Sequence, residues 1–293
     1  MRFAKHRPDP STAEIVVDHD GGWYRLVSLP GFEQVSRLAE VVTVPAVEAI
    51  ASTLPRAAAG LEPVLVDLAA SPTVADREPG IWGAGLNYRG HSKDLDAEQP
   101  RSGPGSYLRP PNCLIGNSDT IDLPTQSLRV TAEAELGLVI ATSCKNVDRS
   151  DWRSVVAGVT TVLDMTAEDV IRENSRYIPW AKGFDTFCSI GPALVTMDEF
   201  TDAELCGLTI ATVRNGETVA AGTPAQMKYD IGYLIEYFTA GRTLEPGTVI
   251  CTGTPGAAVI EDGDVVSAVV ENVGTLSHPV RRQAIALVPG LVA

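Results

Sequence analysis

Hydrophobic residues in the first third of the chain fall into short segments that predict several strands and one helix. Four segments have the length and composition of strands: Met1–Lys5, Ala13–Val17, Trp23–Leu29 and Val64–Leu68. The Asp- and Gly-rich residues 18–22 predict a hairpin turn between the second and third strands. Residues 44–53 are expected to be helical, because Thr43 can cap the first turn and the apolar residues share one side. This pattern predicts a small α+β domain over residues 1–78.

Longer apolar segments follow and predict a second unit, residues 79–293, that is mostly β. Its expected strands are Val130–Thr142, Thr248–Cys251, Val265–Val270 and Val280–Ala286. Residues 81–88 are expected to be a buried strand that runs into a loop, and residues 154–165 are a further apolar segment. Residues 166–174 predict a short helix. A longer helix is expected from Thr223, which forms a capping-box pattern with Gln226, to Gly241. Residues 92–105 are polar and lack an apolar period, which predicts a loop that acts as a lid.

Composition narrows the possible partners and the compartment. The 293-residue chain carries a net charge of −14, from 23 Lys and Arg against 37 Asp and Glu. Because no basic patch is evident, nucleic acid and anionic membranes are not expected partners. The 5 cysteines are odd in number and lack metal-ligand spacing. Together with the lack of a membrane-span pattern or a signal-peptide pattern, they predict a soluble cytoplasmic protein with reduced thiols.

The most informative chemistry in the sequence is a pair of glutamates at the start of an apolar run. Glu133 and Glu135 are two residues apart, so a strand would place both carboxylates on one face, with Cβ atoms roughly 7 Å apart. Asp164 lies in the next long apolar segment. Three hard oxygen ligands favour Mg²⁺, Mn²⁺ or Ca²⁺ over zinc. The alternative is that the pair forms the solvated face of an amphipathic strand.

Other segments, taken with this pair, resemble those of a known family. These segments are Gly85-Leu86-Asn87-Tyr88-Arg89-Gly90-His91, Trp180-Ala181-Lys182-Gly183-Phe184-Asp185-Thr186-Phe187, Cys251-Thr252-Gly253-Thr254-Pro255 and Asp262-Gly263-Asp264. In this order and spacing, roughly residues 81–282 resemble the fumarylacetoacetate hydrolase (FAH) family. The resemblance implies a mainly β (α+β) protein: a mixed β-sandwich roll behind a small α+β N-terminal domain, usually assembled as a homodimer or a higher oligomer.

The resemblance also assigns roles to individual residues. It implies that Glu133, Glu135 and Asp164 bind Mg²⁺ or Mn²⁺. It matches His91 to the general base that activates water or takes a proton from the substrate. It matches Lys182 to the cation that stabilises developing negative charge near the metal.

Further residues are implied around the substrate and the lid. Thr254 matches a loop residue that contacts the substrate, and Arg89 is a second candidate for this contact. An acid that follows the histidine pairs with it in the family, and here Asp94 or Glu98 could do so. Asp94 is one methylene shorter than the usual Glu, so both acids remain candidates.

Departures from the family pattern affect the residues expected to contact the substrate. Glu168 stands where an Arg is usual and Ile171 stands where a Gln is usual. Tyr107 and Arg109 occupy a segment in which Phe-x-Lys-Pro is common. Because Glu168 places like charge near a carboxylated substrate, either Arg109 supplies the missing cation or the substrate is less anionic than usual.

The expected function is metal-dependent hydrolysis of a C–C bond in a β-dicarbonyl small molecule, with a keto acid as the substrate. One alternative is decarboxylation of a β-keto acid such as oxaloacetate, or enol–keto isomerisation, at the same metal site. A second alternative is a ligand-binding homologue without catalysis. The changes at Glu168 and Ile171 keep this second alternative open, while the metal ligands are all present.

Overall fold

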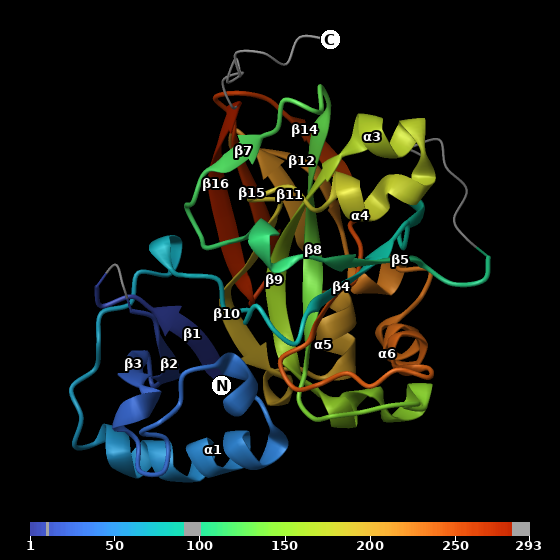
Figure 1. Ribbon diagram of the computed structural model, residues 1–293. Coiled ribbons are helices and arrows are strands. Elements are labelled where there is room, and N and C mark those ends of the chain that lie inside the picture. The colour runs from blue at the N-terminus through green and yellow to red at the C-terminus, as the bar shows by residue number, and fades with distance from the viewer. Residues whose placement is uncertain (10–11, 91–100, 283–293) are drawn as a thin grey trace, which may run out of the picture.

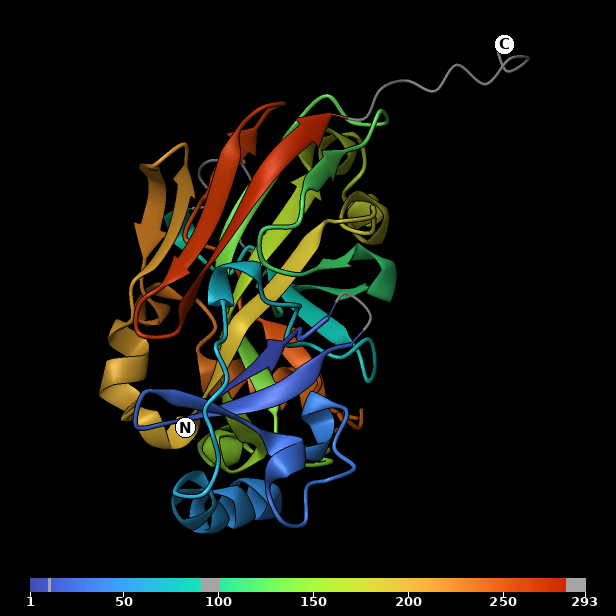
Figure 2. The same ribbon diagram turned by 90° about the vertical axis from the view of Figure 1, so that its left-hand side faces the viewer.

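Two β-sheets packed face to face form the body of the protein. The computed structural model describes residues 1–9, 12–90 and 101–282. In spatial order, the larger sheet contains β3 (Gly22–Arg25), β2 (Glu14–His19), β1 (Arg2–His6), β10 (Cys188–Thr196), β9 (Val156–Ala167), β8 (Val130–Ile140), β13 (Val249–Cys251), β4 (Ile81–Gly85) and β5 (Gly105–Arg109), with β6 (Leu114–Ile115) beside β10 and β14 (Ala257–Ile260) beside β8. The smaller sheet contains β12 (Glu217–Gly222), β11 (Ile210–Arg214), β15 (Val265–Val270), β16 (Gly274–Arg282) and β7 (Ile121–Leu123). Figure 2 shows the two layers, and the mainly β fold agrees with the prediction.

Strands β8 and β9 form the centre of the larger sheet and are buried along their whole length. They pair antiparallel with one another, and their inner face packs against β11 and β15 of the smaller sheet. Strands covered on both faces are expected to be almost continuously apolar, and these two largely are. Any carboxylate on them therefore lies in a setting that disfavours an unpaired charge.

Short helices surround the sheets. They are α1 (Val44–Ala58), α3 (Glu168–Glu173), α4 (Ile178–Ala181), α5 (Asp202–Gly207) and α6 (Ile231–Thr239). In Figure 1, α3 and α4 lie together at the upper right, beside the upper part of β8, with α4 next to β5. The chain leaves β9 and enters α3 directly, which brings the end of a central strand and the start of a helix to the same region.

The N-terminal strands extend the larger sheet. β1 pairs antiparallel with β10, with Phe3 opposite Leu194. Asp20 and Gly21 connect β2 to β3 with φ values of 50° and 78°, as a two-residue type I′ turn requires. Helix α1 begins after Thr43, as predicted, and its cap accepts a hydrogen bond from Ala46 N at 3.4 Å. The division at residue 78 stays a prediction.

Two predicted strand segments are wrong or shorter than expected. Residues 64–68 form no strand: Val64 makes a single bridge to Trp23, and Leu65 is 92% exposed. The segment lies on the edge of β3 and turns away after one backbone hydrogen bond, from Val64 N to Trp23 O at 2.7 Å. The strand expected over 23–29 ends at Arg25 and continues as a 3₁₀ turn.

The helix predicted from Thr223 to Gly241 is also wrong, because it is two separate pieces. A 3₁₀ turn spans Pro224–Gln226, and α6 begins only at Ile231, with Asp230 as a new N-cap. Buried Asn87 explains the break. Its carbonyl oxygen accepts from Lys228 N at 2.7 Å, and its side chain accepts from Tyr229 N at 2.8 Å. These bonds replace the intrahelical bonds that a continuous helix would need.

Some expectations concern residues outside the described ranges. Strand β16 ends at Arg282, so the last part of the strand expected over 280–286 lies outside them. Most of the expected lid, residues 92–105, also lies outside them. In the part of the chain that the structure describes, no helix combines the length and apolarity needed to cross a membrane.

One buried histidine gives a testable link between the fold and pH. His278 on β16 is fully buried, its Nδ1 lies 2.8 Å from Asp119 O, and its Nε2 has no hydrogen-bond partner among the described residues. Burial lowers the pKa of His278 below its usual value. The unfolded chain then binds this proton more readily than the folded one. Stability is full above about pH 6.5 and falls as pH drops below that value.

We therefore expect the free energy of unfolding to fall between about pH 6.5 and 5.5 more steeply in the wild type than in His278→Gln, by at most about 1.4 kcal/mol per pH unit. Urea unfolding at several pH values measures this difference. An unchanged slope in His278→Gln would contradict the account.

Candidate metal centre

Glu133, Glu135 and Asp164 form one buried cluster in the centre of the larger sheet. Glu133 and Glu135 are alternate residues of β8, so they share a face, and Glu133 lies directly opposite Asp164 in the β8–β9 ladder. One carboxylate oxygen from each lies within 4.8 Å of the others. All three residues are buried, so the alternative of a solvated strand face is wrong.

Lys182 is a buried cation in direct contact with two carboxylates of this cluster. It follows α4, and its Nζ donates to Asp164 Oδ1 at 2.8 Å, Glu133 Oε2 at 3.3 Å and Thr166 Oγ1 at 2.6 Å. Although burial alone would lower the pKa of Lys182, Asp164 and Glu133 raise it above its usual value. The ammonium therefore stays charged beside the carboxylates.

Arg109 lies behind the cluster. Its guanidinium donates to Asp164, to the backbone oxygen of Lys182 and to Met165 O, the last at 3.1 Å. Its side chain is fully buried and does not line the cavity described below. The structure thus places Arg109 where it orients Asp164, and its expected contact with the substrate stays untested.

Tyr107 completes the surroundings of Asp164. Its hydroxyl donates to Asp164 Oδ2, and Lys182 Nζ lies 4.9 Å from the centre of its ring. Gly83 on the neighbouring strand β4 leaves room for this ring, because a Cβ there would lie 2.1 Å from the nearest ring atom. β4 and β5 therefore together position the Tyr107 hydroxyl against the Asp164 carboxylate.

The two carboxylates for which a pKa shift is resolved respond in opposite directions. Burial, and then the charge of Asp164, raise the pKa of Glu135 well above its usual value. Burial acts in the same direction on Asp164, but Arg109 and Lys182 hold its pKa below the usual value. Three carboxylates face two cations, so one negative charge stays uncompensated at the Glu135 side.

The chemistry of this donor set fits a divalent cation. Its ligand atoms are carboxylate oxygens, which Mg²⁺ and Mn²⁺ prefer. A dication would turn the surplus negative charge into a surplus of one positive charge. The second oxygen of Glu135 is held by Gly253 N at 2.9 Å, which fixes the orientation of this side chain. Glu133, Glu135 and Asp164 would therefore hold the metal.

A cavity of about 260 Å³ opens onto the cluster. Glu133, Glu135, Tyr107, Lys182 and Thr254 contribute to its polar end, and its walls are mostly apolar, formed by residues that include Leu86, Ile171 and Ile178. This volume is near the lower end of the range for small-molecule sites. The cavity thus suits a small, partly apolar ligand with a polar group at the metal end.

Glu168 also lines this cavity, but it is not an unpaired anion. Its carboxylate accepts from Arg129 Nε at 2.7 Å and from Arg172 Nε at 2.6 Å. The two arginines outnumber this one carboxylate, so the ion cluster of Glu168, Arg129 and Arg172 carries one net positive charge. The sequence interpretation of Glu168 as a source of repulsion overlooked Arg172. The (i, i+4) spacing of these residues on the predicted helix was the signal that could have revealed the pair.

The remaining expected site residues lie elsewhere. Arg89 is exposed and lines a separate hollow with Gln226, Lys228 and Pro255. His91, Asp94 and Glu98 lie outside the described residues, so their roles stay predictions.

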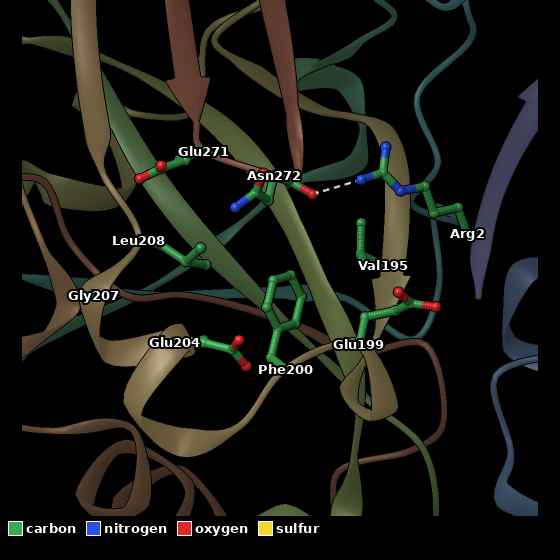
Figure 3. Close-up of a pocket in the computed structure, with 9 residues that line it drawn as sticks. All are labelled: Arg2, Val195, Glu199, Phe200, Glu204, Gly207, Leu208, Glu271 and Asn272. Carbon is green, nitrogen blue, oxygen red and sulfur yellow. Dashed lines mark hydrogen bonds between the residues drawn. The ribbon is translucent and has the colours of Figure 1, made fainter.

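A further hollow lies near β10 and α5 and has an acidic rim (Figure 3). Its acids are engaged within the fold. Glu204 accepts from Thr201 N at 2.8 Å, Glu271 accepts from Thr209 N at 3.1 Å, and Arg2 donates to Asn272 O at 3.0 Å. The opening is therefore bordered by structural caps and contacts.

A two-sheet fold with a buried carboxylate cage defines a class of metal-site enzymes, and comparison with known proteins identifies the family. Residues 80–281 match the model of the fumarylacetoacetate (FAA) hydrolase C-terminal domain. The chain belongs to the fumarylacetoacetate hydrolase family, whose members among its relatives are hydrolases, isomerases and tautomerases.

Individual relatives have different activities. An uncharacterized protein of Pyrococcus abyssi is 39% identical over 66% of this chain and 86% of its own length. Human mitochondrial oxaloacetate tautomerase FAHD2A is 35% identical over 80% of this chain and 76% of its own. Maleylpyruvate hydrolase from Sphingobium sp. SYK-6 is 27% identical with a TM-score of 0.80, covering 97% of this chain and 100% of its own. A structure of that hydrolase with manganese(II) and pyruvate shares the fold at a TM-score of 0.78 and 24% identity.

Removing the charge of one expected metal ligand tests the carboxylate cage formed by Glu133, Glu135 and Asp164. We expect Glu135→Gln to weaken Mn²⁺ binding roughly ten- to hundred-fold, because the amide keeps the shape of the side chain and removes its charge from a buried site. A calorimetric Mn²⁺ titration measures the change. Glu217→Gln, on an exposed position of β12, is the matched control and should bind as the wild type does. Equal affinity in wild type and Glu135→Gln would contradict the assignment.

Proposed function

We propose that this protein is a metal-dependent hydrolase that cleaves a C–C bond in a β-dicarbonyl acid of the acylpyruvate type. The observation that carries the proposal is the buried cluster of Glu133, Glu135 and Asp164 with Lys182 beside it, at the end of a small cavity. A bound Mg²⁺ or Mn²⁺ would act as a Lewis acid toward the substrate oxygens, and Ca²⁺ also fits the oxygen donor set.

The residues of the chain would divide the remaining work. Lys182 Nζ, which donates to Asp164 and Thr166, would stabilise negative charge that develops on a substrate oxygen. Thr254 lines the cavity and is buried, which fits a contact with the polar part of the substrate. Hydrolysis also needs a base for water, and His91 is the residue that the sequence proposes for this step.

Keto–enol tautomerisation of a keto acid is the second candidate. The 35% identity with a human oxaloacetate tautomerase favours it. It would use the same metal cage and Lys182 but no attacking water. Incubating the purified protein and Mg²⁺ with an acylpyruvate and, separately, with enol-oxaloacetate distinguishes the two reactions. Release of pyruvate supports the hydrolase, whereas loss of enol absorbance without cleavage of any acylpyruvate supports the tautomerase.

A cytoplasmic location and a homodimer remain proposals. The buried free cysteines Cys113, Cys144, Cys188 and Cys251 agree with a reducing compartment. The human relative, in contrast, is mitochondrial.

A substitution of Lys182 can distinguish an effect on catalysis from an effect on metal binding. We expect Lys182→Met to lower kcat by roughly a hundred- to a thousand-fold, because it removes a charged donor from the reacting end of the cavity. Mn²⁺ binding should persist, since the three ligand carboxylates stay in place. Steady-state kinetics and a calorimetric titration of the same sample measure both quantities, with exposed Lys145→Met as the control. Full activity in Lys182→Met would refute the role.

A further inference from the structure

Two buried cysteines lie side by side behind the metal centre. Cys113 ends the 3₁₀ turn Pro111–Cys113, and the next residue, Leu114, pairs with Cys188 of β10 in the parallel β6–β10 ladder. Neighbouring strands are about 4.8 Å apart and rise about 3.3 Å per residue, so the Cα atoms of Cys113 and Cys188 are separated by roughly 5.8 Å. A disulfide spans Cα separations of about 4.4–6.8 Å. Both thiols are free in the structure and lie within this range.

The two thiols interact directly and are not equivalent. A hydrogen bond with Cys188 lowers the pKa of Cys113 to about 7; burial opposes this shift, and the charge of Arg109 adds to it. The same hydrogen bond, and then burial, raise the pKa of Cys188 well above its usual value. Because the thiolate is the form that attacks an oxidant, Cys113 is the reactive member and Cys188 is the partner that stays protonated.

Cys113 lies directly beneath a surface turn. Its thiol donates to Pro110 O at 2.9 Å, and Pro111 and Asn112 of the same turn are exposed. Pro110 also lines an open hollow of about 410 Å³. The turn is held by the side chain of Asn112, which donates to Gly183 O at 3.2 Å. Local opening of this one short turn would therefore bring a small oxidant to Cys113.

Arg109 connects the cysteine pair to the expected metal ligand Asp164. Asp164 lies opposite Cys188 in the β9–β10 ladder, and its carboxylate accepts from the Arg109 guanidinium. The pKa of Arg109 is well above its usual value: burial acts against the charge, whereas Asp164, and then Cys188 and Cys113, favour it. The guanidinium thus divides its attraction between one carboxylate of the cage and the two sulfurs.

We propose that Cys113 and Cys188 form a redox-active pair, which a peroxide oxidises to a disulfide, and that this disulfide weakens divalent-cation binding at the carboxylate cage. A disulfide sulfur cannot become a thiolate, so oxidation removes the negative charge that Cys113 can place near Arg109. Arg109 then acts on Asp164 alone, and the cage offers less negative charge to a dication. The proposal needs the metal site but no particular reaction there, so it goes beyond the proposed function.

The oxidation balances with one molecule of hydrogen peroxide. The Cys113 thiolate attacks one peroxide oxygen, the O–O bond breaks, and the leaving hydroxide takes up a proton to become water. The sulfur of Cys188 then attacks the Cys113 sulfenic acid, the S–O bond breaks, and a second water leaves with the Cys188 proton. Each sulfur has lost one electron, and each peroxide oxygen has gained one.

Thiol mapping of the purified full chain tests the pair. The reduced, metal-free protein is treated with a small excess of hydrogen peroxide, desalted and alkylated, and its peptides are analysed by mass spectrometry without reduction. We expect one linked pair of peptides, Cys113 with Cys188, which dithiothreitol separates. Cys206→Ser is the control, because Cys206 is exposed on α5, and it should form the same link. Free thiols at both positions, irreversible oxidation of Cys113 or a link to another cysteine would overturn the proposal.

A calorimetric Mn²⁺ titration of the same samples tests the effect on the cage. We expect oxidation to raise the Kd of the wild type roughly three- to ten-fold, as the loss of one charge separated from the ion by two residues predicts. Dithiothreitol followed by desalting should restore the affinity. Cys113→Ser keeps a donor for Pro110 O but forms no thiolate, so it should bind Mn²⁺ as weakly as the oxidised wild type and should not respond to peroxide.

The two measurements keep this proposal separate from the assignment of the metal site. An unchanged wild-type Kd after oxidation, or an equal response to peroxide in Cys113→Ser, would overturn the link between the disulfide and the cage. If the reduced wild type binds no Mn²⁺, the assignment of the cage fails and the proposed effect on binding fails with it, while the linked peptides would still support the redox pair. The wild-type results do not depend on the folding of either variant.

Discussion

Three carboxylates buried on two neighbouring central strands are the constraint on which the rest of the structure depends. Glu133 and Asp164 lie opposite one another, and Glu135 lies on the same face two residues along. Charges so placed in an apolar sheet need positive partners. Lys182 and Arg109 supply part of this charge and both concentrate on Asp164. Glu135 is the carboxylate that the protein leaves least compensated, so the site as a whole favours a divalent cation.

Contacts from the surrounding strands and turns orient the carboxylates of this cluster. β4 and β5 bring Tyr107 to Asp164, with Gly83 providing the space for the ring. The loop after β13 brings Gly253 N to Glu135, and Gly253 has a φ of 91° that a side chain would disfavour. The orientation of each ligand is thus determined by contacts from a different part of the fold. The cavity opens onto this cluster, and residues of α3 also line it.

Local sequence patterns predicted the cage well and predicted the substrate end poorly. The alternation of side chains on a strand places Glu133 and Glu135 on one face wherever that strand pairs, so their proximity follows from spacing alone. The direction in which a long side chain points does not follow from spacing alone. Arg109 could point into the cavity or beneath Asp164, and only the packing of β5 against β4 and α4 sends it beneath. Arg172 reaches back one helical turn to Glu168, a contact that the (i, i+4) spacing on a helix indicates and that counting charges alone does not.

Tertiary contacts likewise overrode local propensity in the backbone. The residues from Thr223 to Gly241 have the caps and apolar spacing of one helix, yet a single distant side chain divides them. Asn87 bonds the backbone of residues 228 and 229, and Asp230 then starts α6. The strand expected at residues 64–68 fails because only Val64 finds a partner at the edge of β3. Neither partner is a neighbour in sequence, so neither outcome was visible in the local pattern.

The central claim is that a divalent cation occupies the cage of Glu133, Glu135 and Asp164. Crystals grown with Mn²⁺ and measured at the manganese absorption edge test it most directly, because anomalous scattering locates the ion without reference to activity. The account predicts a single strong anomalous peak with a carboxylate oxygen of each of the three residues about 2.0–2.3 Å away. No peak between these carboxylates in Mn²⁺-saturated crystals, or a peak held by other residues, would contradict it.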